Sequence, residues 1–138
     1  MKYKGVEIWQ LIPQRNPMVM VDEFEATAEN VAQTALHVRT DNLLMHPDGT
    51  LAETGLIEHI AQSAAALAGF QSADGSAPRI GLIGEVKHFE CSRRPAAGEV
   101  VHTVIEFGFS FGNVTLVQGR CRIDDEEIAS ANLKIFMQ

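Results

Sequence analysis

Two polar side chains, Glu58 and Gln62, stand within an otherwise apolar stretch of the sequence, Thr54 to Phe70. Apolar residues occur on nearly every side of that stretch, which is typical of a helix buried in a protein interior. Because the two polar residues are four apart, they stack on one face of such a helix. Desolvation disfavours the charged form of a buried carboxylate, so one rarely occurs without a partner or a function. Glu58 is therefore a candidate for acid or base chemistry, and Gln62 is the residue expected to orient it.

A second interpretation of Glu58 stays open. A glutamate near the start of a helix can be hydrated or hydrogen-bonded, and it then only complements the positive end of the helix dipole. The helix sequence alone does not separate this structural role from a catalytic one.

The composition indicates one ordinary domain, and we expect residues 1–138 to form it, because 138 residues with 46% hydrophobic content suffice for one core. No apolar run is long enough to span a membrane and the N-terminus lacks a signal-peptide pattern, so we expect a cytoplasmic protein. The net charge of −7 argues against a nucleic-acid partner. Cys91 and Cys121 lack metal-ligand spacing, so we expect free thiols, with no metal or organic cofactor.

Periodicity and turn residues predict mostly strands around the central helix. The expected elements are a short helix over 6–12, strands over 18–24 and 32–40, the long helix, and strands over 79–91, 99–111, 114–123 and 128–137. The long helix is expected to end at Gly69, and a mobile loop is expected over 71–78. Phe107, Phe109 and Phe111 share the apolar face of their strand, where we expect core packing or, alternatively, the lining of an acyl tunnel. Short links between consecutive strands favour an α+β architecture, a curved antiparallel sheet around one helix.

Three segments carry a resemblance to a known family. Residues 11–22 read LIPQRNPMVMVD, which is similar to a segment of the form L-x-P-H-R-x-P followed by four apolar residues and Asp. Residues 58–62, EHIAQ, are similar to E-x-x-A-Q on a central helix, and residues 86–89 precede an R-P turn at 93–95 and a Gly-Glu pair at 98–99. Together these segments resemble the 3-hydroxyacyl-[acyl-carrier-protein] dehydratases, which have the hotdog fold.

The resemblance implies a site that eliminates water from a 3-hydroxyacyl thioester carried by an acyl carrier protein, with no cofactor. It also implies that a histidine and the helix glutamate share the proton transfers across a dimer interface. Gln14 occupies the position of that histidine, and a glutamine side chain cannot transfer a proton. Backbone N–H groups near Gly55 and Leu56 are expected to hold the thioester oxygen.

Several activities stay open in the absence of the histidine. Glu58 can act as both acid and base, or another histidine can substitute; His46 is the better candidate, because His59 points about a hundred degrees away from Glu58 on the helix. The chain can instead be the inactive partner of a catalytic subunit in a heterodimer. A hotdog thioesterase is a further alternative, in which Glu58 activates water and Gln14 positions it.

The resemblance implies a homodimer, a heterodimer or a larger assembly. Docking an acidic carrier protein would require a local basic patch on this acidic chain, and the nearest candidate is Arg93 with Arg94, joined by Lys87 and Arg79.

Overall fold

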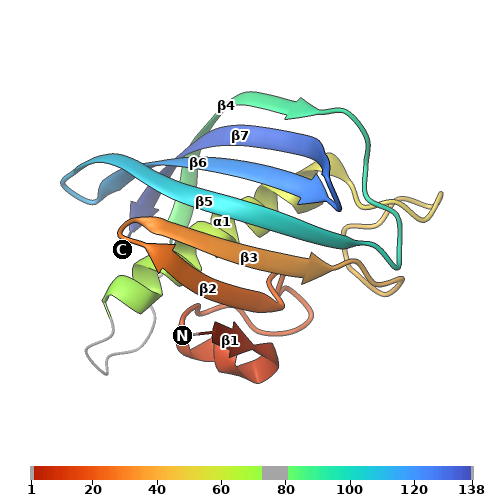
Figure 1. The fold of residues 1–138 in the computed structure, drawn as a ribbon, viewed down its shortest axis with the longest axis horizontal. Coiled ribbons are helices and arrows are strands. Elements are labelled where there is room, and N and C mark those ends of the chain that lie inside the picture. The colour runs from red at the N-terminus through yellow and green to blue at the C-terminus, as the bar shows by residue number, and fades with distance from the viewer. Residues whose placement is uncertain (1, 73–80, 138) are drawn as a thin grey trace.

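A seven-stranded antiparallel sheet and one long helix dominate the structure, a computed structural model in which residues 2–72 and 81–137 are described. The elements in chain order are β1 (Lys2–Lys4), a 3-10 helix (Gly5–Gln10), β2 (Glu23–Ala28), β3 (Val31–His37), α1 (Glu53–Gln71), β4 (Gly81–Cys91), β5 (Val100–Phe111), β6 (Val114–Ile123) and β7 (Glu126–Met137). The strand order in the sheet is β1-β2-β3-β5-β6-β7-β4. The sheet curves over α1 (Figure 1), and the hotdog fold predicted from the sequence is confirmed.

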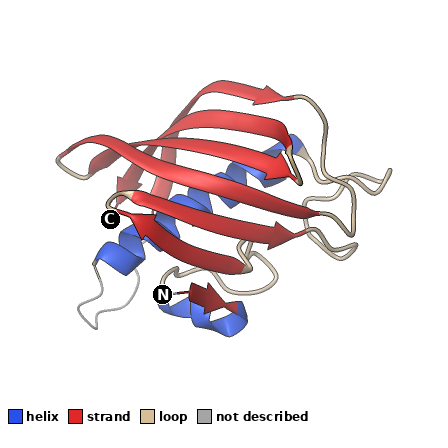
Figure 2. Cartoon of the chain, in the orientation of Figure 1, coloured by secondary structure: helices blue, strands red, loops and turns tan. Residues whose placement is uncertain are grey.

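The core lies between α1 and the concave face of the sheet (Figure 2). Leu56 and Ile60 of the helix are fully buried, and so are Val101 and Ile105 of β5. The two helix side chains lie one turn apart, and the two strand side chains alternate with exposed residues, as the two kinds of element require. Burial of each of these side chains contributes about 2 kcal/mol. The central helix is therefore held mainly by apolar packing.

The strand predicted over 18–24 begins only at Glu23, and that prediction is wrong for its first residues. The backbone of Met18 and Met20 is hydrogen-bonded by side chains of α1 instead of by a neighbouring strand. A strand requires a ladder of backbone hydrogen bonds, so this apolar run remains a loop, with Met20 and Val21 buried and Met18 exposed.

Gly69 does not end the helix, which continues to Gln71. A Cβ atom at position 69 would collide with the backbone carbonyl oxygen of Leu11. The glycine therefore allows α1 to lie directly against the loop. Its role is close packing, and not the helix C-cap that was predicted.

Phe109 and Phe111 are 69% and 54% exposed, so the prediction that they belong to the core is wrong for this chain. A bulge between Phe107 and Ser110 interrupts the alternation of β5. The two exposed rings pack against each other with their centroids 5.6 Å apart.

Most of the remaining boundaries agree with the predicted ones to within a few residues. β1 was not predicted. The first two residues of the strand expected over 79–91, and most of the loop expected over 71–78, lie outside the described residues. Cys91 and Cys121 are free thiols. Within the described residues, no helix has the length and apolar character needed to cross a membrane.

Candidate active site

The Gln62 side chain ties α1 to the loop that precedes β2. Its Nε2 donates hydrogen bonds to Glu58 Oε2 at 2.7 Å and to the carbonyl oxygen of Met18 at 2.8 Å. Its Oε1 accepts a hydrogen bond from the Met20 N–H at 2.7 Å. Both N–H groups and the oxygen of the Gln62 amide are thus hydrogen-bonded. The amide holds the carboxylate of the half-buried Glu58 in a fixed direction.

His59 makes a second link between the helix and the same loop. Its Nδ1 lies 2.6 Å from the carbonyl oxygen of Met20, and its Nε2 lies 2.8 Å from Thr103 Oγ1. A carbonyl oxygen only accepts, so Nδ1 carries the proton and Nε2 accepts from the Thr103 hydroxyl. Burial lowers the pKa of His59 to about 4, which keeps the imidazole neutral near pH 7. The sequence analysis set His59 aside; a histidine within an apolar helix, next to Glu58, was the available signal.

The loop around Gln14 is held from its other side by Arg15. The Arg15 guanidinium donates to the carbonyl oxygens of Ile12 at 2.9 Å, Gln14 at 2.8 Å and Trp9 at 3.2 Å, and it lies 5.0 Å from the centre of the Trp9 ring. These contacts fix the backbone on both sides of Gln14. The individual contacts of Arg15 were not predicted from the sequence.

The side chain of Gln14 contributes a buried hydrogen-bond acceptor to this loop. Its Oε1 atom is buried and has no hydrogen-bond partner among the described residues. A buried polar atom without a partner costs stability, and native structures keep few of them. The position therefore offers an acceptor that a bound group or water can use, and it offers no proton-transfer group.

The N–H groups expected to bind a thioester oxygen are engaged within the helix. Gly55 N donates to the carbonyl oxygen of Ala52 at 2.8 Å, and Leu56 N donates to the same oxygen at 3.2 Å. Neither donor is free in this structure, because the first turn of α1 closes on Ala52. Gly55 also lets Leu51 approach the helix, since a Cβ at position 55 would lie 2.6 Å from Leu51 Cδ1. A substrate oxygen would have to compete with Ala52 for these donors.

His46 belongs to a surface network at the start of α1. Its Nε2 lies 3.7 Å from Glu53 Oε1, and the half-exposed Arg94 pairs with Asp48 at 2.9 Å in the same region. Within the described chain, no contact joins His46 to Glu58. The structure thus brings Glu58 together with Gln62 and leaves His46 in a separate cluster.

The predicted basic patch is largely neutralised by acids. Arg93 Nη1 lies 3.0 Å from Glu99 Oε1, and its Nε lies 3.2 Å from a carboxylate oxygen of Glu126. Lys87 Nζ lies 3.2 Å from Glu85 Oε1. Arg79 lies outside the described residues. Arg93 therefore contributes little net positive charge for an acidic partner, and the Glu85 carboxylate, which Lys87 shares with Lys134, leaves only one excess positive charge there.

Comparisons with known proteins agree with the architecture. The sequence model of the ApeP-like family, described as ApeP dehydratase, matches residues 6–138. No curated protein matches the chain in sequence.

Three solved structures illustrate the likeness in fold. A structure of the dehydratase heterocomplex ApeI:P from Xenorhabdus doucetiae superposes with a TM-score of 0.87 at 16% identity, over 95% of this chain and 90% of that one. The E. coli PaaI protein from the phenylacetic acid degradation operon superposes with a TM-score of 0.64 at 10% identity, over 82% of this chain and 80% of that one. A proposed thioesterase related to phenylacetic acid degradation, from Ralstonia eutropha, gives 0.65 at 16% identity, over 83% of each chain.

Proposed function

Because the chain belongs to the ApeP-like dehydratase family, we propose that it supplies the glutamate half of a site that dehydrates 3-hydroxyacyl thioesters on an acyl carrier protein. In this reaction a base removes a proton from the carbon next to the thioester carbonyl. An acid then protonates the departing hydroxyl, which leaves as water while a carbon–carbon double bond forms. Where two groups share these proton transfers, as the family resemblance implies, Glu58 provides one of them.

The bridge that Gln62 makes between Glu58 and the loop is the observation that carries this proposal. Gln62 donates to one carboxylate oxygen of Glu58 and to Met18 O from the same nitrogen. A fixed hydrogen-bond donor on one oxygen orients the carboxylate, so that its other oxygen can exchange a proton with a substrate at a set position. The second proton-transfer group is missing at position 14, where the amide of Gln14 stands.

The free edge of the sheet supports association with a second subunit. β4 is an 11-residue strand at the end of the strand order, and it pairs with β7 on one side. A long strand edge presents unpaired N–H and carbonyl groups, and a strand of another chain can complete them. The opposite edge is the 3-residue strand β1. We therefore propose pairing through β4 with a homologous subunit.

The composition of such a pair decides whether it can be active. In a pair of two identical chains, Gln14 stands at the histidine position of both sites. In a pair with a related subunit that keeps the histidine, that histidine and Glu58 together complete one site. A heteromeric dehydratase is the arrangement that gives Glu58 a catalytic partner, and the ApeI:P heterocomplex is a solved structure with a similar fold.

Reconstitution of the pair tests this proposal. The chain is assayed for enoyl thioester formation alone, and again in a purified stoichiometric complex with a dehydratase subunit that carries the L-x-P-H-R segment. The complex is expected to turn over 3-hydroxyacyl thioesters, and Glu58→Gln is expected to lower that turnover about 10²- to 10⁴-fold. Glu53→Gln, on the same helix but in the surface network, is the matched control. Full activity of the Glu58→Gln complex would rule out the proposed role.

A second variant distinguishes dehydration from thioester hydrolysis. Gln14→His restores the missing group, and it is expected to give the chain alone measurable dehydration. The buried free acceptor of Gln14 can also hold a water molecule, and a thioesterase would require Glu58 to activate such a water. Release of free thiol by the unaltered chain, with no gain of enoyl product in Gln14→His, would favour the thioesterase.

A further inference from the structure

The face of the sheet turned away from α1 carries an exposed apolar row across four strands. Leu82 pairs with Phe136, Phe136 with Val114, and Val114 with Phe111, so the four side chains lie side by side on one face. Leu82 and Phe136 are 49% and 40% exposed, and Phe109 packs against Phe111 at the end of the row. Clustered exposed apolar side chains of this size mark interaction surfaces.

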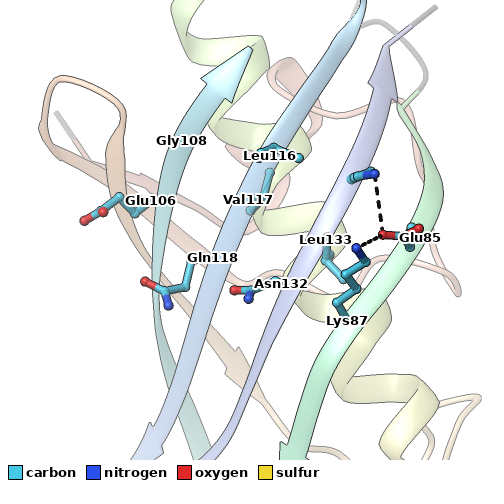
Figure 3. A pocket seen from close by; sticks show the side chains of 10 residues that line it. Glu85, Lys87, Glu106, Gly108, Leu116, Val117, Gln118, Asn132 and Leu133 are labelled. Carbon is cyan, nitrogen blue, oxygen red and sulfur yellow. Dashed lines mark ion pairs between the residues drawn. The ribbon is translucent and has the colours of Figure 1, made fainter. Parts of the chain in front are cut away.

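A charged row crosses the same four strands on the same face. Lys87 pairs with Asn132, Asn132 with Gln118, and Gln118 with Glu106. Figure 3 shows these four side chains in a line across the strands, with α1 behind the sheet. They border a shallow groove of about 340 Å³. Both rows therefore belong to one surface.

The two ends of the charged row have opposite net charge. At the β4 end, the single carboxylate of Glu85 lies 3.2 Å from Lys87 Nζ and 3.6 Å from Lys134 Nζ, so these three groups keep one excess positive charge, while the exposed Glu90 lies one row further along β4. At the β5 end, Glu106 makes no ion pair within the described residues, so this end is negative.

We propose that this face packs against the same face of a second copy of the chain, with a two-fold axis parallel to the strands and midway between β6 and β7. Such an axis exchanges β4 with β5 and β6 with β7. It places Lys87 opposite the partner's Glu106, and Asn132 opposite the partner's Gln118. In the apolar row it places Leu82 opposite the partner's Phe111, and Phe136 opposite the partner's Val114. One symmetry operation thus satisfies both rows.

The charges select this axis over its alternative. A two-fold axis perpendicular to the strands would place β4 on the partner's β4 and reverse the strand direction. If that axis passes through the charged row, it brings Lys87 against Lys87 and Glu106 against Glu106; if it passes between the two rows, it brings the charged row against the apolar row. Like charges in an interface cost several kcal/mol. Two packed sheets lie about 10 Å apart and cross at about 30°. The outer strands of the rows lie about 7 Å from the axis. At that distance the crossing angle displaces facing residues by about 4 Å along the strands, which long Lys and Glu side chains can span.

The mass of the chain alone in solution tests the proposal. Light scattering is performed on the full chain over a range of concentrations, and the largest species is expected to halve its mass in Phe111→Asp, because the variant places a charge in the apolar row. Leu43, which is 52% exposed in a loop, provides the control Leu43→Asp, which is expected to leave the mass unchanged. Pairing through β4 does not alter the test, since the mass then halves from a larger starting value. A failure of the proposed function therefore leaves the result interpretable.

Charge exchange gives a second test that does not depend on the fold tolerating an aspartate. Lys87→Glu and Glu106→Lys are each expected to raise the dissociation constant at least about tenfold, because each creates like-charge pairs across the axis. The double variant is expected to restore association, because it only reverses the direction of the pairs.

Three results would overturn the proposal. One is that the unaltered chain alone is a monomer, or that its mass in solution is the same in all variants. Another is a double variant that is no better than the singles. The third is an unchanged mass of the chain alone combined with loss of binding to the histidine-bearing subunit in Phe111→Asp, which would assign this face to that subunit.

Discussion

Helix α1 fixes the two ends of the loop from Leu11 to Met20, whereas in its middle Arg15 holds the backbone and the Gln14 side chain is left without a hydrogen-bond partner among the described residues. At the first end Gly69 lies directly against the Leu11 carbonyl, and at the second end Gln62 and His59 hold Met20 by its N–H and its carbonyl oxygen. In the middle, the Gln14 side chain keeps a buried oxygen with no hydrogen-bond partner among the described residues. The loop is thus positioned by groups other than residue 14, so a change at position 14 can remove the proton-transfer group and preserve the framework.

Removal of the Gln62 amide should break the second end of the loop. In Gln62→Leu the buried Met20 N–H and the part-buried Met18 carbonyl both lose their hydrogen bonds, and the free energy of unfolding should fall by about 4 kcal/mol. Urea unfolding measures this loss. Glu58→Gln is the control and should change stability by less than about 0.5 kcal/mol, because its side-chain oxygen still accepts from Gln62. A loss below about 1 kcal/mol in Gln62→Leu would show that the loop is held by other means.

Acid should weaken the same end of the loop through His59. The pKa of about 4 in the folded chain lies below the ordinary 6.5, so the unfolded chain binds a proton first as the pH falls. This group therefore has no effect above about pH 6.5, and it removes about 3 kcal/mol of stability between there and about pH 4. His59→Gln lacks the titration, so the stability difference between the unaltered chain and the variant should shrink as the pH falls. Parallel pH profiles from urea unfolding would contradict this account.

A methyl group at the first end of the loop should also be costly. Gly69→Ala forces α1 away from the Leu11 carbonyl, and it should destabilise the protein by about 2 kcal/mol. This sign is opposite to that of an ordinary Gly→Ala change within a helix, which stabilises by about 1 kcal/mol. Thermal and urea unfolding measure the change. Ala68→Gly, at the neighbouring position, serves as the control and should cost only the propensity difference. A stabilised Gly69→Ala would mean that the contact is not tight.

The middle of the loop should respond in the opposite direction. Gln14→Met keeps a similar shape and removes the unpartnered oxygen, so stability should rise by about 1 kcal/mol. Urea unfolding again provides the measurement. A loss of stability instead would mean that the Gln14 amide has a partner in solution, and the contrast between the ends and the middle of the loop would disappear.

Local signals predicted the parts of the fold that depend on neighbouring residues. β6 was predicted with its observed bounds, because two turn signals, Gly112-Asn113 and Asp124-Asp125, delimit it. The 18–24 segment was predicted as a strand because its composition suits one, but its hydrogen-bond partners come from α1, far along the chain. The exposure of Phe109 depends on a bulge, which alternation does not reveal.

The candidate site shows the same division. The contact between Glu58 and Gln62 follows from a spacing of four residues on a helix, so it could be inferred before the structure. The position of His59 depends on Met20 and Thr103, which approach it only in the folded chain. The engagement of the Gly55 N–H depends on where the first helical turn closes, which the sequence does not define to one residue.

The unequal edges of the sheet limit how far strand addition can spread. β1 has three residues and leads directly into a 3-10 helix, so it is a poor template, whereas β4 offers eleven residues. When two chains join through β4, each chain has used its long edge strand. Among the described strands, only the short strand β1 then remains for a third chain to pair with. Growth into fibres by strand addition would require β1 as a second template, and its three residues, two of them lysines, make it a poor one.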